Sequence, residues 1–448
     1  MNSVLLRQQI MAIAGNGVNP RFQLRAVFSV GAVKYTAQAV IGKYTLEEYG
    51  KLYTSVIKIQ VAMITRDYMA LFKSRDNISV TVFQEQVDPS SEVKFANGLS
   101  YQTTYRGFLT DNSIASLKTD SGLNSTPFTD GSDDLRIFTV QLVDPVALSM
   151  SAKSAQGTFR LSSVVDSLST FIISKTDEDA QKGLPKLLGL DIVDPDVTGT
   201  TAVRKQLIID HRVKMTDLAH YLQVKEGGIY NHAIGSFIKG CFWYIYPLFN
   251  TSRFTQTERR LIVLIADSLK LPTADRTYQL ENQTLTVIST GGAKTQDISV
   301  AGDINNGNGV HFQKATEFFE NPVVDDGDNK AVYNRQAMSA DIQRGKRADG
   351  LTFANVSENP ITDNVPRELS KMASWAGMLM TVEWQRSDIR LLTPGMPVRV
   401  YYDNGSSTQT LEGTLLRAEE MWNTEVPGMT QKMQVSAASL TFFLRKPA

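Results

Sequence analysis

Side chains alternate between apolar and polar in several segments near both ends of the chain. Four such segments lie in the first third: Phe22 to Ala26, Val56 to Val61, Ile78 to Val82 and Phe138 to Leu142. Period two places every second side chain on one face, which is typical of a β-strand with one buried and one wet face. The first third is therefore predicted to form an antiparallel sheet, which ends where Asp144 and Pro145 stop the last run.

Helical spacing replaces this alternation in the middle of the chain. Apolar residues from Leu161 to Ile172 recur at helical intervals around a capping box formed by Ser163 and Asp166. A second helix is predicted at Thr216 to Leu222. The middle third is therefore predicted to be mixed α/β.

Two further segments carry helical signals of different quality. Thr255 and Glu258 form a capping-box pattern in front of Leu261 to Ile265, which predicts a third helix there. Leu369 to Leu379 also fits a helix, although Met378 to Trp384 alternates like a strand. The boundary between helix and strand stays open in this overlap.

Strand patterns return toward the C-terminus, after a long stretch from Gly291 to Gly350 that is rich in Asn, Asp and Gly and reads as loop. The expected strands are Leu280 to Ile288, Pro397 to Tyr402, Leu411 to Arg417 and Leu440 to Leu444, with turns at Asn404-Gly405 and Pro427-Gly428. Strand-rich segments at both ends suggest two copies of one domain type. The predicted division is 1–145, 146–275, 276–365 and 366–448.

Charge and cysteine content exclude several classes of protein. Lys plus Arg equals Asp plus Glu, at 46 each, so no net field draws nucleic acid or anionic lipid to the whole surface. The single cysteine, Cys241, excludes an internal disulfide and any multi-thiolate metal site. No export signal or membrane anchor is expected, because Arg7 interrupts the apolar N-terminus and Ile238 to Phe249 is too short to span a bilayer.

The chain offers little of the chemistry that enzymes need. It contains no Gly-x-Ser-x-Gly string, and the look-alike of a phosphate loop at Thr290 to Thr295 has the wrong spacing, so a glycine turn is the better interpretation. Cys241 lies in an apolar run where burial should raise the pKa of its thiol. Paired carboxylates cannot be singled out among the 46 acidic residues.

Metal and sugar sites are weakly indicated. The four histidines, His211, His220, His232 and His311, lack metal-ligand spacing, and an acidic loop of Asp325, Asp326, Asp328 and Asn329 lacks the closing glutamate of a calcium loop, although a stray ion there stays open. Trp243, Tyr244 and Tyr246 favour core packing, with a carbohydrate-stacking platform as the alternative. The sequence therefore names no catalytic residue, no cofactor-binding residue and no metal ligand.

Three stretches in a fixed order carry a resemblance to a known family. They are Val140 to Leu148 with Phe159 to Leu168, then Met215 to Leu222 with Gly227, Gly228 and Phe242-Trp243, and finally Leu391 to Val400 with Leu411 to Arg417 and Ala438 to Arg445. Together they resemble the central baseplate hub of contractile-tailed phages and its relative, the valine-glycine-repeat hub of type VI secretion. The stretch from Asp297 to Gly350 departs from the family pattern.

The resemblance implies a β-rich α+β fold with two tail-tube-like antiparallel β-barrels and smaller mixed α/β domains between them. It implies a homotrimeric, non-enzymatic virion protein, assembled in the host cytoplasm, whose ring joins the tail tube to the central spike. Tape-measure and baseplate wedge proteins are further expected partners. Because the type VI hub usually continues into a fused spike, the end at Ala448 implies a separate spike protein. DNA is expected to pass the lumen without specific binding.

Two other functions stay open at this point. The alternatives are another β-rich tail component, either a tube initiator or a receptor-binding protein, and a wall-degrading hydrolase. Four residues are assigned to the fold alone: Pro394 and Gly395 to a turn, Gly413 to a strand bend, and Trp243 to the core.

Overall fold

The computed structural model places the strands and helices of this chain around three main hydrophobic cores. The structure describes residues 3–15, 17–19, 21–87, 100–109, 135–181, 185–195, 204–225, 228–266, 276–289, 293–298, 324–325, 331–332, 373–374, 377–403, 407–424 and 434–445.

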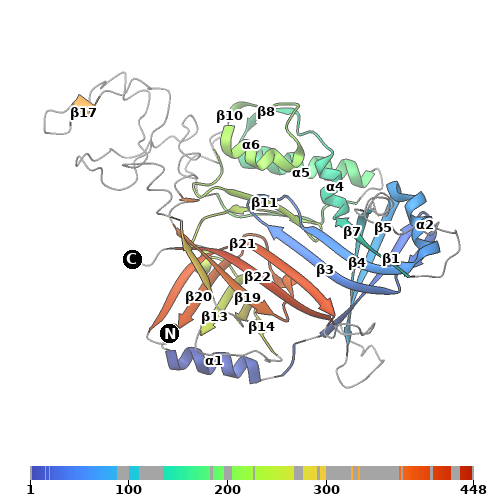
Figure 1. The fold of residues 1–448 in the computed structure, drawn as a ribbon. Helices are drawn as coiled ribbons and strands as arrows, with labels where there is room; N and C mark the ends of the chain where they lie inside the picture. The colour runs from blue at the N-terminus through green and yellow to red at the C-terminus, as the bar shows by residue number, and fades with distance from the viewer. Residues whose placement is uncertain are drawn as a thin grey trace.

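One mixed sheet of fifteen strands organises the molecule (Figure 1). Its strands are β1 (Arg21–Val30), β2 (Val33–Thr36), β3 (Ala39–Glu48), β4 (Val56–Ile64), β5 (Ile78–Val87), β6 (Ser100–Leu109), β7 (Leu135–Val143), β13 (Arg260–Ala266), β14 (Tyr278–Glu281), β15 (Thr284–Ile288), β16 (Lys294–Asp297), β19 (Gly377–Gln385), β20 (Pro397–Asp403), β21 (Thr408–Thr424) and β22 (Gln434–Arg445). Outside it lie two small sheets of the connector described below and the pair β17 (Val324–Asp325) with β18 (Ala331–Val332).

Eight of these strands close on themselves and form the first strand set. Pairing runs from β21 through β3, β4, β7, β6, β5 and β1 to β22, which pairs with β21 again. Every pair is antiparallel, and the alternating side chains of β1, β4, β5 and β7 face one core with Trp422. The strands predicted from alternation in the first third are thus confirmed.

The second strand set curls around a different core. Its order is β14, β15, β13, β20, β21, β22 and β19, with β16 added on the outer edge of β19. The side chain of Thr277, next to β14, donates to the Gln385 carbonyl of β19 over 2.7 Å, and Trp384 Nε1 donates back to Thr277 Oγ1 over 3.2 Å. These bonds bring the two ends of the set together. Two pairs, β13 with β15 and β13 with β20, are parallel.

The strands β21 and β22 belong to both sets. One part of β21 pairs with β20, and the part from Arg417 onward pairs with β3. The two strands pair with each other along almost their whole length, with a register shift between Leu415 and Arg417. In Figure 1 they run from the region of β19 and β20 to that of β3. The two ends of the chain therefore build one continuous sheet.

A mixed α/β connector lies on one side of this sheet and has its own core. Its elements are α4 (Pro145–Ser151), β8 (Gly157–Ser162), α5 (Val164–Gln181), β9 (Gly189–Ile192), β10 (Arg204–Ile209), η2 (Met215–Asp217), α6 (Leu218–Lys225), β11 (Ile234–Lys239) and β12 (Phe242–Pro247). Asp144 caps α4 by accepting from the Val146 and Ala147 amides, and the predicted capping box is confirmed, since Ser163 Oγ accepts from the Asp166 amide over 3.0 Å. The helix predicted around this box is α5, and the helix predicted at Thr216 to Leu222 is η2 with α6, so both predictions are confirmed.

Short helices complete the fold. They are α1 (Ser3–Gly15), α2 (Thr65–Lys73), η1 (Arg75–Asn77), η3 (Arg253–Thr255) and η4 (Ile389–Leu391). Helix α1 packs Leu6 and Ile10 against Leu264 and Ile288, on the side of the sheet opposite to α5 and α6 (Figure 1).

Three expectations need correction or refinement. The third helix at Leu261 to Ile265 is wrong, because this segment is β13, a strand buried on both faces between two parallel neighbours. The overlap before Trp384 is a strand, β19; residues 369–372 lie outside the described part. The β-rich fold is confirmed, but the strands form one mixed sheet with two parallel pairs where two antiparallel barrels were expected. The predicted domain boundaries stay predictions.

Candidate functional site

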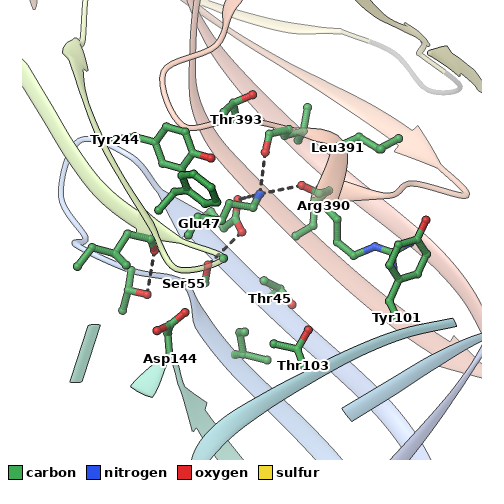
Figure 2. Close-up of a pocket in the computed structure, with 18 of the residues that line it drawn as sticks. Thr45, Glu47, Ser55, Tyr101, Thr103, Asp144, Tyr244, Arg390, Leu391 and Thr393 are labelled. Carbon is green, nitrogen blue, oxygen red and sulfur yellow. Dashed lines mark hydrogen bonds and ion pairs between the residues drawn. The ribbon is translucent and has the colours of Figure 1, made fainter. Parts of the chain in front are cut away.

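A cavity of about 570 Å³ lies where the two strand sets and the connector meet. Its walls come from β3 to β7 of the first strand set, from β11 and β12 of the connector, and from β14 and the η4 segment of the second strand set. Figure 2 shows Thr45, Glu47 and Thr103 facing the same space, with Arg390 extended toward Tyr101. All three parts of the molecule thus contribute polar side chains to one place.

Lys239, at the end of β11, connects these three parts. Its ammonium donates to Glu47 Oε2 over 2.7 Å and to the carbonyls of Ile389 and Leu392 over 2.8 and 3.0 Å. The Glu47 carboxylate also accepts from Tyr49 and Ser55, over 2.6 and 3.0 Å. The side chain of Lys239 is 16% exposed and that of Glu47 is 3% exposed, so this ion pair is largely shielded from water. We name these groups the Lys239 latch.

Glu420 of β21 binds the segment that carries η4. The Glu420 carboxylate accepts from Ser387 Oγ over 3.0 Å, from the Ile389 amide over 3.3 Å and from Trp422 Nε1 over 2.6 Å. Burial raises the pKa of Glu420, and the nearby ammonium of Lys43 acts in the opposite direction. The carboxylate thus fixes the turn between β19 and β20 to a strand that both sets share.

Arg390 projects from η4 into the first strand set. Its Nε and Nη2 donate to Asp388 over 2.7 and 2.6 Å, and its guanidinium lies 3.6 Å from the ring centre of Tyr101. A guanidinium over an aromatic face is held by the charge distribution of the ring. The η4 segment thus places a cation against β6 of the first strand set.

Other titratable groups of the cavity wall have structural tasks. Burial raises the pKa of Asp144, although its two hydrogen bonds with the amides of α4 oppose this change. Burial also raises the pKa of Tyr105 to about 12 and the pKa of the Cys241 thiol, as predicted for Cys241. A thiol whose pKa is raised carries little thiolate at neutral pH and is a poor nucleophile.

The two acids in the cavity wall differ in how far the protein itself occupies their oxygens. Glu47 accepts from Lys239, Tyr49 and Ser55, and Asp144 accepts from the first amides of α4. A general acid or base needs a free oxygen within hydrogen-bond reach of a substrate. These donors take both oxygens of Glu47, whereas both amides reach Oδ1 of Asp144, and none of the hydrogen bonds found in the described part reaches its Oδ2.

The four residues assigned to the fold have clear environments. Pro394 and Gly395 form the predicted turn, where Gly395 has a φ of +65° and a Cβ would lie 2.0 Å from Tyr246 Cδ2. Trp243 is 1% exposed and donates to Ser236 Oγ over 2.9 Å, which confirms its place in the core. Gly413 lies within β21, where a Cβ would be 1.9 Å from the Phe443 carbonyl oxygen. The irregularity of β21 falls two residues later, after Leu415.

The residues considered for metal or sugar binding do not form one site in the described part of the chain. Among the residues that the structure describes, no three His, Cys, Asp or Glu side chains gather as ion ligands. His311 and most of the acidic loop lie outside the described residues, as do the glycines of the phosphate-loop look-alike. Tyr246 is 1% exposed and donates to the Tyr49 carbonyl over 2.9 Å, while Tyr244 reaches the cavity wall.

Sequence reasoning missed the residues of the latch. Nothing local distinguishes Lys239, because its partners Glu47, Ile389 and Leu392 are 150 or more residues away in the chain. Glu47 gave no signal either, because it shares the polar face of its strand with Lys43 and Thr45, and only the structure shows that this face is buried.

Large apolar side chains are exposed on several outer surfaces. On β7, Leu135 and Ile137 are 60% and 56% exposed and lie two residues apart on one face. The connector exposes Leu161, Ile173 and Ile208, the last on β10. Within the described residues, no helix is long and apolar enough to cross a membrane.

Comparison with known proteins gives structural neighbours only. No protein-family model and no curated protein matches the sequence. Among solved structures, the chain is similar to the 43 kDa tail protein of prophage MuSo2 from Shewanella oneidensis, at 7% identity and a TM-score of 0.42, with 95% of this chain and 99% of that chain covered. It is also similar to a tail protein from Neisseria meningitidis MC58, at 8% identity and a TM-score of 0.40, covering 94% and 96%.

A third neighbour comes from a different assembly. In the lidded PdpA-VgrG complex of Francisella, one chain is similar at 10% identity and a TM-score of 0.40, with 99% of this chain and 56% of that chain covered. The neighbours reported are thus two tail proteins and a chain of a VgrG complex.

Proposed function

We propose that this chain is a structural subunit of a contractile-tail baseplate hub, and that it acts by assembly rather than by catalysis. The observation that carries the proposal is the pair of strand sets, each wrapped around its own core and joined by β21 and β22. One chain thus offers two curled strand sets in a fixed relation. Three chains would present six such units, which suits a ring that adapts a six-fold tail tube to a three-fold spike.

The exposed apolar residues supply surfaces for such assembly. Leu135 and Ile137 on β7 form one candidate contact between copies, since isolated apolar residues are common on surfaces but neighbouring ones on one strand face favour an interface. The equal numbers of acidic and basic residues suit a ring through which DNA passes without being held by its phosphates. In this proposal the tube protein and a separate spike bind opposite faces of the ring, with tape-measure and wedge proteins as further contacts.

The test is the native mass of the purified protein, alone and with candidate tube and spike proteins. A homotrimer that binds both is expected, and a strict monomer without affinity for either would overturn the proposal. The double variant Leu135→Glu/Ile137→Glu is expected to weaken trimer formation at least tenfold, because it buries charge at the contact. Thr36→Glu, on the exposed strand β2, serves as the matched control and is expected to assemble normally.

Two alternatives make different predictions. Another tail component, such as a tube initiator or a receptor-binding protein, would bind a tube or a host surface without forming a ring with a spike. A wall-degrading hydrolase would clear a peptidoglycan suspension in a turbidity assay. Protein donors occupy both oxygens of Glu47, which favours the structural function over the hydrolase.

A further inference from the structure

The cavity at the junction has an unequal supply of hydrogen-bonding groups. Thr45 and Gln84 are 3% and 5% exposed, and both line the cavity, yet Thr45 Oγ1 and Gln84 Nε2 have no hydrogen-bond partner in the described part of the chain. A buried polar atom without a partner costs about 1 to 3 kcal/mol, so such atoms usually mark a bound molecule or ordered water.

Cationic donors add to this excess. Arg390 uses Nε and Nη2 on Asp388, but its Nη1 has no partner among the described residues. Lys43, two residues before Thr45 on β3, contacts the ring of Trp422 at 5.7 Å, and none of the hydrogen bonds or ion pairs found in the described part involves its ammonium. Burial lowers the pKa of Lys43, and the nearby carboxylates of Glu420, Asp388 and Glu47 offset this only in part.

Three of the four carboxylate oxygens in the same wall are already in use. The Glu47 carboxylate accepts from three donors and Asp144 from two backbone amides. The wall thus has donors to spare and few acceptors, which is the opposite of a cation site. A molecule that completes it must bring acceptor oxygens.

The strand register places these donors together. Gln84 on β5 pairs with Tyr101 on β6, and the Arg390 guanidinium lies against the ring of Tyr101. On the other side, Lys43 and Thr45 lie on one face of β3, and Figure 2 shows Thr45 pointing into the space between Glu47 and Thr103. A volume of about 570 Å³ is ample for a small anion.

We propose that this cavity is a binding site for an oxyanion of the carboxylate or phosphate type, held by Lys43, Thr45, Gln84 and Arg390. The anion is either a free small molecule or a carboxylate on another polypeptide, since both offer the same acceptor oxygens. Binding would brace the η4 segment against β3 and β5, and so strengthen the contact between the two strand sets.

The test compares binding of three probes by calorimetry and thermal unfolding, at constant ionic strength set with chloride. The probes are inorganic phosphate, succinate and an acetylated, amidated Gly-Asp-Gly peptide. At a probe concentration about 100-fold above Kd, the midpoint of unfolding should rise by about 3 °C. Binding of phosphate or succinate supports a free anion, and binding of the peptide alone supports a carboxylate of a partner.

Variants locate the site. Gln84→Met and Thr45→Val remove one donor each at nearly constant volume and should weaken binding at least about fivefold. Gln102→Met, on the exposed face of β6, is the matched control and should bind as the unchanged protein does. The proposal would be overturned if no probe bound more tightly than chloride. It would also be overturned if Gln84→Met bound the probes as tightly as the unchanged protein does. Should both variants fail to fold, anomalous scattering from arsenate soaked into crystals of the unchanged protein decides: density in the cavity supports the site and its absence rejects it.

Discussion

The first and second strand sets reach a closed core by different means. In the first set every strand pair is antiparallel, and the side chains alternate between the core and the outside. In the second set β13 lies between two parallel neighbours, and Leu261, Val263, Leu264 and Ile265 are each at most 1% exposed. Alternation therefore reveals the first set in the sequence, while a strand buried on both faces looks like any apolar run.

Removal of β21 and β22 should have the largest effect on this comparison. A chain that ends before residue 408 lacks β21 and β22. These same two strands close the first set and complete the second. Both sets are expected to lose cooperative folding, as measured by near-ultraviolet circular dichroism and limited proteolysis.

The matched control for this truncation is the full chain with a protease site inserted at residues 404–406. The chain is cut at this site, and both pieces stay in the sample. It should remain folded, since no strand is lost. A truncated chain whose first set resists proteolysis would show that the two sets fold independently.

Substitution of Gly413 tests the shared strands without removing them. A Cβ at this position would lie 1.9 Å from the Phe443 carbonyl oxygen, so backbone must move. Gly413→Ala is expected to lower the free energy of unfolding by about 3 to 5 kcal/mol. Gly15→Ala, where nothing lies within 4 Å of the added Cβ, should change it by less than about 0.5 kcal/mol. Urea unfolding measures both, and equal effects would contradict the close contact of β21 with β22.

The Lys239 latch connects the two sets to the connector and comes next in size. Lys239→Met leaves the Glu47 carboxylate buried without its cation and is expected to cost about 3 kcal/mol. The double variant with Glu47→Gln should recover part of this loss, because no unpaired charge remains. Lys51→Met breaks the exposed ion pair with Glu48 and should cost at most about 1 kcal/mol. Equal losses for Lys239→Met and Lys51→Met would contradict the latch.

A pH series on Glu420→Gln gives the smallest expected effect. Because burial raises the pKa of Glu420, the folded chain binds its proton more tightly than the unfolded chain does. Above the raised pKa of the folded chain, the ionised Glu420 carboxylate therefore lowers the stability of the fold. This loss of stability disappears as the pH falls toward 4.5, the ordinary pKa of a glutamate. The stability of the unchanged protein relative to Glu420→Gln should therefore rise on acidification, by at most about 1.4 kcal/mol per pH unit. A flat difference from pH 7 to pH 4 would contradict the raised pKa.

Much of the local structure could be predicted from the sequence. Alternation located β1, β4, β5 and β7, and the Ser163 and Asp166 capping box located α5. The Thr255 and Glu258 pattern misled, because a capping box describes the start of a helix but cannot show whether the following residues find parallel neighbours. Local signals thus identified most of these strands and helices, but they did not show that β13 is a strand with parallel neighbours.

The arrangement of the whole and the site were beyond local signals. Pairing of β3 with β21 joins residues more than 350 positions apart, and no pattern within either strand specifies its partner. The cavity needs Gln84, Lys239 and Arg390 at once, from three distant parts of the chain. Each of these residues has an unremarkable sequence environment, so only the register of the sheet identifies them.

The position of β21 and β22 in the sequence has a consequence for synthesis. The strands β1 to β7 leave the ribosome early, but their circuit stays open until residues 408–445 are made. At about 5 to 20 residues per second, β1 and β3 wait on the order of 20 to 80 s with unpaired edges. A nascent chain in this state is exposed to pairing with its neighbours on the same message, so chaperone protection or slow expression should raise the yield of folded protein.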